Sequence, residues 1–498
     1  MRDRRDEVRK FLAVVGAIVG LSGTTAFAQG QRLPLSQVLP ELVLREIVLQ
    51  PGTVGPPHVA HFSPLTNDLN NPVVGIVQGF NGQMATQFAT FPLGSSAGGL
   101  TYEFDPSVGT LRRGSASFGP LFSERALTIG RRKLSVGFNY QHTSYNTFEG
   151  QNLDDGSIKF YLRHQDCCHF DDPAALTGFS TTPLNGNDRL NPPFKGDVIE
   201  AALSLKATTH TAAVFANYGV TDHWDVGLAV PFVRVNLEAG VTARILRLVT
   251  CPDPAVPSQC FPTTHAFDYN NPFVPLVLQQ SGHAAGLGDV VLRTKYHFLR
   301  RGNGGLAAAV DLRLPTGDKN ELLGAGGVQG KFLLIASSER GRFGQHVNIG
   351  YTMAGGRVGG AFAGLTSAPL PDEINYSGGL EFVATRRLTV IGDFVARTLR
   401  GAGRLDLVSK QFEYNEPPSP GGIPGPGCGG FVGFTCRTTS FKEFAPRSSD
   451  LRLLLGTAGV KYNLIGNVLV SASVLFPLTN AGLRSRVTTM IGMDYVIK

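Results

Sequence analysis

From residue 134 to its C-terminal end, the chain places apolar side chains at every second position of many short segments. In residues 134–141 (LSVGFNYQ), the even positions are apolar or aromatic and the odd positions are Ser, Gly, Asn and Gln. The same alternation recurs in residues 224–232, 306–314 and 375–382. A period of two is typical of a β-strand that has one face against an apolar phase and the other against water.

The spacing of these segments predicts a β-barrel. We expect strands near residues 134–146, 198–218, 223–247, 286–301, 305–315, 328–339, 343–354, 374–384, 387–400, 450–463, 467–477 and 486–497. Tight turns are expected at 219–222, 302–304, 339–342, 385–386 and 464–466, and long loops at 147–197, 248–285, 355–373 and 401–449. Short turns on one rim and long loops on the other are the layout of outer-membrane barrels.

The predicted fold class is therefore all-β: a transmembrane antiparallel up-and-down barrel of about twelve strands, with its short turns at the periplasmic rim. Residues 156–165 are expected to form a hairpin arm inside the first long loop. Alternatively, this segment and residues 122–130 are two further strands, which would make fourteen. Placing all tight turns at one rim puts both ends of the barrel there, requires an even strand number and puts all six cysteines at the opposite side.

The first residues predict an export signal. Basic residues among the first ten, an apolar stretch at 11–21 and the sequence Ala26-Phe27-Ala28 are typical of a cleaved signal peptide. We therefore expect a signal peptide at 1–28, a barrel domain at 122–498 and location in the cell outer membrane. The expected partners are outer-membrane lipid and the barrel assembly machinery.

Residues 29–121 do not follow the alternation of the barrel. Residues 36–49 predict a short amphipathic helix broken at Pro40, and Gly, Pro and polar residues dominate from residue 51 onward. The segment is interpreted either as a plug that folds into the lumen or as a periplasmic segment.

Charge and cysteine content narrow the function further. The formal net charge of +7 is mild and scattered, so we expect no nucleic-acid partner. The cysteines fall in predicted loops of an exported protein, where disulfides are the default. Bridges 251–260 and 428–436 are the natural pairs, and the adjacent Cys167 and Cys168 are expected to bridge each other or reach another loop. The full predicted set is Cys167, Cys168, Cys251, Cys260, Cys428 and Cys436.

Three blocks carry a resemblance to a known family. Residues 218–231 (YGVTDHWDVGLAVP), residues 286–289 (GLGD) with the strand that follows, and residues 314–318 (LPTGD) resemble the outer-membrane transporter family named for the MetA pathway of phenol degradation. The resemblance extends over about residues 197–498. It implies an uptake barrel for small hydrophobic molecules, similar to those for aromatic hydrocarbons and long-chain fatty acids.

If the apolar faces contact lipid, the alternate positions line the lumen. The predicted lumen-lining residues are Asn139, Gln141, Asp225, Arg293, Lys295, His297, Asp311, Arg313, Glu381, Asp393 and Arg397. Such charges can control passage through a pore, or they can pair across strands and simply fill a narrow interior.

The sequence predicts no catalytic residues, no metal site and no cofactor. His164, Cys167, Cys168 and His169 include zinc-ligand types, but adjacent cysteines seldom give tetrahedral geometry and an oxidising exterior competes for the thiols. His142 with Ser144, and Asp222 with His223, lack a third catalytic partner.

The predicted function is diffusion of small molecules, hydrophobic or aromatic, across the outer membrane. Two alternatives remain open at this point. One is a general porin for polar solutes, and the other is a surface barrel that transports nothing and whose long loops bind a partner.

Overall fold

The structure is a computed structural model. It describes residues 33–50, 72–95, 99–105, 110–163, 197–248, 265–363, 367–416 and 435–497. The predicted signal peptide lies outside the described residues, and so do Cys167, Cys168, Cys251, Cys260 and Cys428. Cys436 is described and is disulfide-bonded. The predicted cysteine pairs stay predictions.

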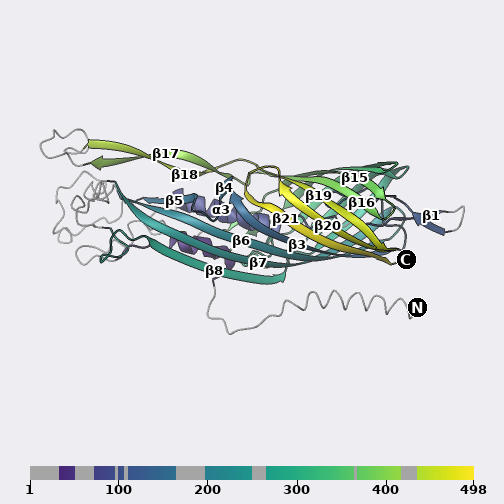
Figure 1. Cartoon of the computed structure of the whole chain (residues 1–498), viewed down its shortest axis with the longest axis horizontal. Coiled ribbons are helices and arrows are strands. Elements are labelled where there is room, and N and C mark those ends of the chain that lie inside the picture. The colour runs from purple at the N-terminus through teal and green to yellow at the C-terminus, as the bar shows by residue number, and fades with distance from the viewer. Residues whose placement is uncertain are drawn as a thin grey trace, which may run out of the picture. The chain divides into compact units, whose positions relative to one another are not determined.

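Twelve antiparallel strands form a closed barrel, as the alternation predicts (Figure 1). The first strand of the barrel pairs with the second on one side and with the last on the other, which closes the wall. The strands are β3 (Leu134–Phe148), β6 (Asp197–Gly219), β7 (Trp224–Arg247), β9 (Val291–Arg301), β10 (Gly304–Arg313), β11 (Gln329–Arg340), β12 (Phe343–Ala354), β15 (Glu373–Thr385), β16 (Leu388–Leu399), β19 (Leu451–Ile465), β20 (Val468–Pro477) and β21 (Leu483–Ile497).

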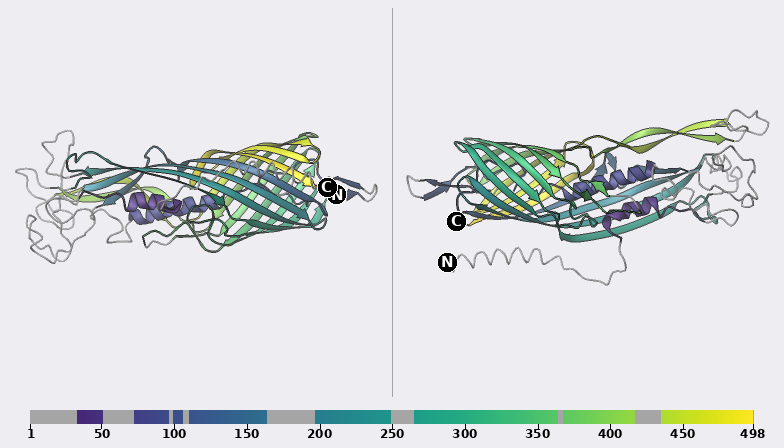
Figure 2. Two further views of the ribbon diagram at one scale, coloured as in Figure 1. Left: turned by 90° about the horizontal axis from the view of Figure 1, so that it is seen from below. Right: turned by 180° about the vertical axis from the view of Figure 1, so that it is seen from behind.

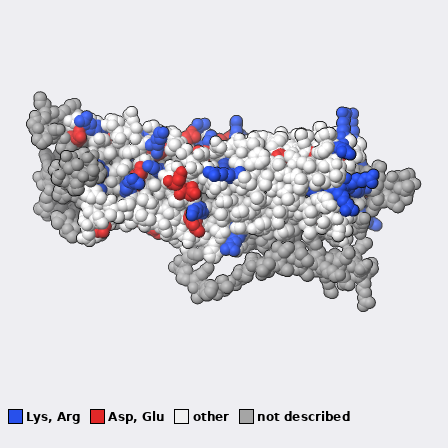
Figure 3. Space-filling model, viewed as in Figure 1, with Lys and Arg blue, Asp and Glu red and all other residues white. Residues whose placement is uncertain are grey.

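The apolar stripe of each barrel strand faces outward. Leu334 and Val347 are 58% and 62% exposed, whereas Asp311 and Glu381 on the inner face are 7% and 1% exposed. Figure 3 shows a stretch of the barrel wall with few charged side chains, beyond which basic residues gather at the short-turn end. An apolar band of this kind matches the hydrocarbon layer of a membrane.

Tight turns join the strands at one rim, as the sequence predicts. The turns between β9 and β10 and between β11 and β12 each contain a glycine with positive φ, Gly302 and Gly341, both at 57°. This left-handed conformation suits two-residue hairpin turns and is strained for other residues. The end of β21 pairs with the start of β3 at the same rim, so both ends of the barrel lie there.

On one side, the wall continues well past the barrel. β6 and β7 are paired over 23 residue positions, and their far halves also pair with β5 (Ile158–Arg163) and β8 (Leu276–Leu287). β5 corresponds to the arm predicted inside the first long loop. β8 is a correction, because residues 276–285 belong to a segment expected to be a loop. Residues 288–290 separate β8 from β9, although both pair with β7. We refer to the far halves of β6 and β7, with β5 and β8, as the extension.

Two helices pack against the inner face of the extension (Figure 2). α2 (Leu35–Leu44) and α3 (Pro72–Ala89) bury Leu39, Leu42, Ile76 and Phe80 in one cluster with the strands. α2 runs through Pro40 instead of breaking there. Burial of most of its side chains offsets the hydrogen bond that proline cannot donate. Neither helix is long and apolar enough to cross a membrane, as far as the described residues go.

Residues 401–449 contain a long hairpin where the sequence predicted a loop. β17 (Arg404–Glu416) and β18 (Thr435–Arg447) pair with each other as a separate sheet. Leu405 and Phe444, one from each strand, are buried against the helices. The apolar positions of β17 change phase, from 405 and 407 to 412 and 414, which hides the strand from a test for strict alternation.

Short strands complete the described part. β1 (Tyr102–Asp105) pairs with β2 (Thr110–Arg113), β4 (Gln151–Asn152) pairs with the end of β3, and β13 (Arg357–Val358) pairs with β14 (Ala368–Pro369). The first barrel strand begins only at Leu134.

Candidate functional site

Residues 114–133 lie inside the barrel near the short-turn rim, and we refer to them as the plug. The plug has no regular secondary structure, and most of its side chains are buried. Inside a membrane-embedded wall, each free backbone group needs a partner, because an unpaired one costs free energy. The barrel wall supplies these partners from inward-facing side chains on many strands.

Carboxylates of the wall accept hydrogen bonds from backbone N–H groups of the plug. Asp393 Oδ2 accepts from Leu121 and Phe122, each at 2.8 Å, and from Ser123 at 3.4 Å. Across the lumen, Asp225 Oδ2 accepts from Ile129 at 3.0 Å. Two further carboxylates do the same, since Glu381 accepts from Gly119 and Glu339 from Ala116. The side-chain amide oxygen of Asn348 accepts from the N–H group of Glu124.

Lysines of the wall donate to backbone carbonyl groups of the plug. Lys295 Nζ reaches the carbonyl oxygens of Arg125 and Leu127 at 3.3 and 2.9 Å. Lys461 Nζ reaches those of Phe118 and Pro120 at 3.3 and 2.7 Å. The wall therefore holds the plug through its main chain, with acids facing N–H groups and bases facing carbonyl groups.

The end of α3 and the residues after it contact the barrel wall on the other side of the lumen. Arg313 Nη1 donates to the carbonyl oxygen of Ala89 at 2.6 Å, and Arg397 Nη1 donates to that of Thr90 at 2.6 Å. Cations suit this position, because the C-terminus of a helix carries a partial negative charge. Asn139 Nδ2 donates to the carbonyl oxygen of Leu93 at 2.6 Å.

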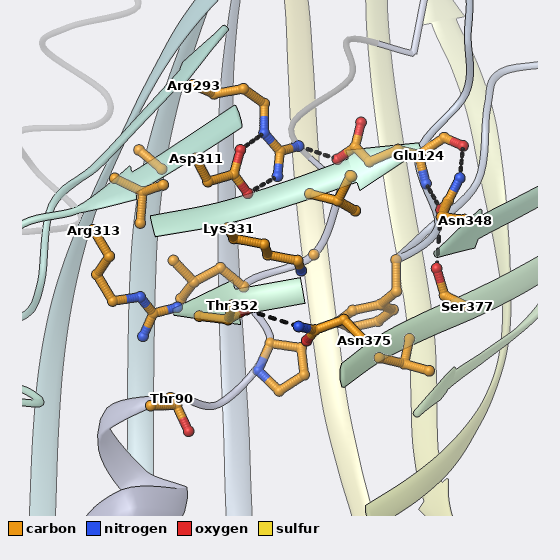
Figure 4. Close-up of a pocket in the computed structure, with 18 of the residues that line it drawn as sticks. Thr90, Glu124, Arg293, Asp311, Arg313, Lys331, Asn348, Thr352, Asn375 and Ser377 are labelled. Atoms are coloured by element: carbon orange, nitrogen blue, oxygen red, sulfur yellow. Dashed lines mark hydrogen bonds and ion pairs between the residues drawn. The ribbon is translucent and has the colours of Figure 1, made fainter. Parts of the chain in front are cut away.

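Between the plug and the end of α3 lies a cavity of about 160 Å³. Its wall is amphipathic, since Phe122, Phe215, Val291, Leu333 and Val395 line it together with charged and amide side chains (Figure 4). The charged lining residues are Glu124, Arg293, Asp311, Arg313, Lys331, Glu373 and Arg397.

Most charges around the cavity are already paired. Arg293 binds both carboxylate oxygens of Asp311 and also contacts Glu124 of the plug. Arg397 Nη1 lies 3.3 Å from Glu373 Oε1. Asn375 Nδ2 donates to Thr352 Oγ1 at 2.7 Å. Figure 4 shows Lys331 extending among these groups without a bond to any residue drawn.

The predicted lumen-lining residues fall into three groups. Arg293, Asp311, Arg313 and Arg397 line the cavity. Asp225, Lys295, Glu381 and Asp393 hold the plug, and Asn139 holds the segment after α3. Gln141 and His297 are buried inside the wall and do not line this cavity. Their roles in transport stay predictions.

The sequence prediction omitted several residues of the cavity. Lys331, Thr352, Glu373 and Asn375 lie on strands that were expected, at positions that alternate with outward apolar residues. Extending the alternation to the strand ends would have found them. Glu124 could not be found in this way, because the plug has no period.

The described residues contain no group of three His, Cys, Asp or Glu side chains that could hold a metal ion. His164, Cys167, Cys168 and His169 lie outside the described residues, so the structure does not test their predicted lack of metal binding.

Residues 178–395 match the sequence model of the family described as "Putative MetA-pathway of phenol degradation". The predicted resemblance is confirmed. The match begins before β6 and ends within β16, so it includes most cavity-lining strands but neither the helices nor the plug. Comparison with curated protein sequences gives no match.

Among solved structures, the chain is similar to the toluene transporter TbuX of Ralstonia pickettii, with 11% identity and a TM-score of 0.30 over 74% of this chain and 90% of that chain. It is also similar to a FadL homologue of Pseudomonas aeruginosa, with 11% identity and a TM-score of 0.29 over 80% of this chain and 94% of that chain.

Proposed function

We propose that this protein is an outer-membrane transporter in which a small molecule passes through the barrel by way of the lumenal cavity. The barrel presents an apolar band to lipid and encloses a polar interior, as membrane-spanning barrels do. The family resemblance favours a small aromatic molecule as the transported compound.

The observation that carries this proposal is the cavity between the plug and the end of α3. A molecule in the cavity is separated from the short-turn rim by the plug and from the extension by the end of α3. In this proposal, a ligand leaves the cavity toward the short-turn rim when the plug moves and toward the extension when the end of α3 moves. Transport would then proceed by alternate opening of the plug and of the contacts between α3 and the two arginines.

The plug inside the lumen disfavours a general porin, because a porin has a continuous aqueous channel. The cavity disfavours a surface protein that transports nothing, since loop binding requires no cavity of mixed polarity inside the barrel. Neither alternative has a specific observation in its favour.

The test uses vesicles that contain the full-length protein and measures entry of benzyl alcohol, an uncharged monocyclic compound, by stopped flow. The wild-type protein should accelerate entry over empty vesicles. Thr352→Trp fills the cavity and should return the rate to that of empty vesicles. Leu334→Trp, on the lipid face of the neighbouring strand, is the matched control and should behave as wild type.

Two outcomes would overturn the proposal. Entry at the rate of empty vesicles, with the wild-type barrel correctly folded, would favour the surface role. Steady ionic conductance of the wild-type protein in planar bilayers, unaffected by Thr352→Trp, would favour the porin.

A further inference from the structure

We infer that the outer face of the barrel wall carries a binding site for the phosphate of a lipid head group, formed by His142, His210 and Arg234. We refer to these three residues as the basic row. The inference takes from the proposed function only the location in an outer membrane, and it does not depend on what the barrel transports. The lipid belongs to the leaflet on the long-loop side, which in an outer membrane is the outer leaflet.

The basic row follows from the sheet register. His142 on β3 is directly opposite His210 on β6, and His210 is directly opposite Arg234 on β7. All three alternate with buried residues and belong to the outward-facing set of their strands, where both histidines are half-buried and Arg234 is exposed. Neighbouring strands are about 4.8 Å apart, so the row spans roughly 10 Å. The ring centroids of the two histidines are 4.6 Å apart.

The basic row lies at the boundary between lipid and water on this face. The row before it, toward the short-turn rim, ends the apolar stripe and consists of Tyr140, Ala212 and Phe232. The row after it, toward the extension, carries hydroxyl and amide groups and consists of Ser144, Thr208 and Asn236. Figure 3 shows charged side chains on the extension side of the apolar stretch. Bases at this depth face lipid head groups, while the acyl chains of the same lipids contact the apolar row.

The hydrogen-bond donors of the basic row are available to a ligand. Tyr140 Oη and His210 Nδ1 are 2.7 Å apart, and this hydrogen bond fixes the orientation of the His210 ring. Arg234 Nε donates to Asn236 Oδ1 at 3.2 Å. The terminal nitrogen atoms of Arg234 and Nε2 of both imidazoles have no hydrogen bond to any described residue. Guanidinium and imidazole N–H groups form charge-assisted hydrogen bonds with phosphate oxygens.

No acidic side chain forms an ion pair with the basic row, as far as the described residues go. The charged groups that act on the His210 ring are His142 and Arg234, and both are bases. Glu238 shares the outward face of β7, but it lies two rows away and directly opposite Lys206. Bases opposite each other on a sheet repel when they are protonated. A phosphate group bound between them offsets this repulsion, whereas an uncharged head group does not.

The experiment measures equilibrium binding of lipid A, the phosphorylated glycolipid of outer membranes, to the full-length protein in detergent by native mass spectrometry. The double variant His210→Gln/Arg234→Gln should weaken binding roughly fivefold or more, because two phosphate donors lose their charge. Lipid A stripped of its phosphate groups should bind the wild type as weakly as intact lipid A binds the double variant. Arg234→Lys should keep most of the affinity. Arg342→Gln, at an exposed position of the short-turn rim, is the matched control and should bind as wild type.

Three results would overturn the inference: equal binding of lipid A by wild type and double variant, equal binding of lipid A with and without phosphate, or the same loss in Arg342→Gln as in the double variant. Inorganic phosphate that displaces lipid A at equal concentration would also overturn it, because the site would then take a free anion. Should the double variant not fold, Tyr140→Phe removes only the hydroxyl that fixes His210 and should weaken binding about twofold. Unchanged binding by Tyr140→Phe would in that case overturn the inference.

Discussion

Asp393 shows how a single inward carboxylate can order an irregular segment. One of its oxygens accepts hydrogen bonds from three consecutive backbone N–H groups of the plug. Alternation along β16 is enough to predict that Asp393 faces inward. The alternation cannot predict the partner of Asp393, because residues 121–123 lie on no strand. Their N–H groups can donate to Asp393 only once the segment lies inside the barrel.

We predict that Asp393→Ala loosens the plug. Three buried N–H groups would lose their acceptor, at about 1–3 kcal/mol for each group left unsatisfied. Ionic conductance in planar bilayers should rise above that of the wild type, and the urea midpoint of unfolding should fall. Glu413→Ala, at an exposed position of β17, should change neither quantity. Unchanged conductance in Asp393→Ala would show that the plug is held by other contacts.

At the scale of elements, β7 changes the direction of its apolar stripe along a single strand. Between Trp224 and Phe232 the apolar residues are at even positions and face outward. Between Val235 and Val241 they are at odd positions and are buried against the helices, while Arg234 and Glu238 are exposed. The strand has no irregularity in its pairing with β6 at this point, so its surroundings change from lipid outside to a protein core inside.

This switch predicts unequal costs for the same charge at two positions on one face of the strand. Val230→Arg introduces a cation into the lipid-facing band and should destabilise the folded barrel by up to about 2–4 kcal/mol, depending on depth. Thr242→Arg, on the same face of the extension, should cost less than about 0.5 kcal/mol. Urea unfolding in lipid vesicles measures both, and equal costs would place the membrane boundary elsewhere.

The barrel strands could be predicted because lipid outside and water or polar groups inside impose a strict period of two. Elements without that environment were harder to predict. β8 belongs to the extension and not to the barrel wall. β17 and β18 contact the helices through Leu405 and Phe444, on one side of the hairpin. The apolar positions of these three strands therefore follow local packing and not a strict period of two. For this reason the sequence of the three segments is interpreted as loops.

At the scale of the whole molecule, the hairpin β17–β18 is an insertion in a complete wall. β16 and β19 pair directly with each other along their length, although the hairpin separates them in sequence. Figure 1 shows the hairpin leaving the barrel on the same side as the helices. Its buried residues pack against α3, and Phe444 also contacts Phe148 at the end of β3, so the hairpin connects the helix to the barrel wall.

Replacing residues 404–447 with a short Gly-Ser linker should therefore leave the barrel folded. The β-sheet signal in circular dichroism should fall only by the share of the hairpin. Entry of benzyl alcohol into vesicles should be faster than with the full chain, because α3 loses the cover of Leu405 and Phe444. Loss of the folded barrel would contradict the interpretation of the hairpin as an insertion. An unchanged rate of benzyl alcohol entry would show that the hairpin does not hold α3 in place.

The position of the plug in the chain also constrains biogenesis. The plug directly precedes β3, the strand that forms the final seam with β21. It is anchored to strands distributed around the circumference, from β7 to β19. We therefore expect the growing sheet to curl around residues 114–133 before its first and last strands join, with this segment as a template for the curvature of the nascent wall.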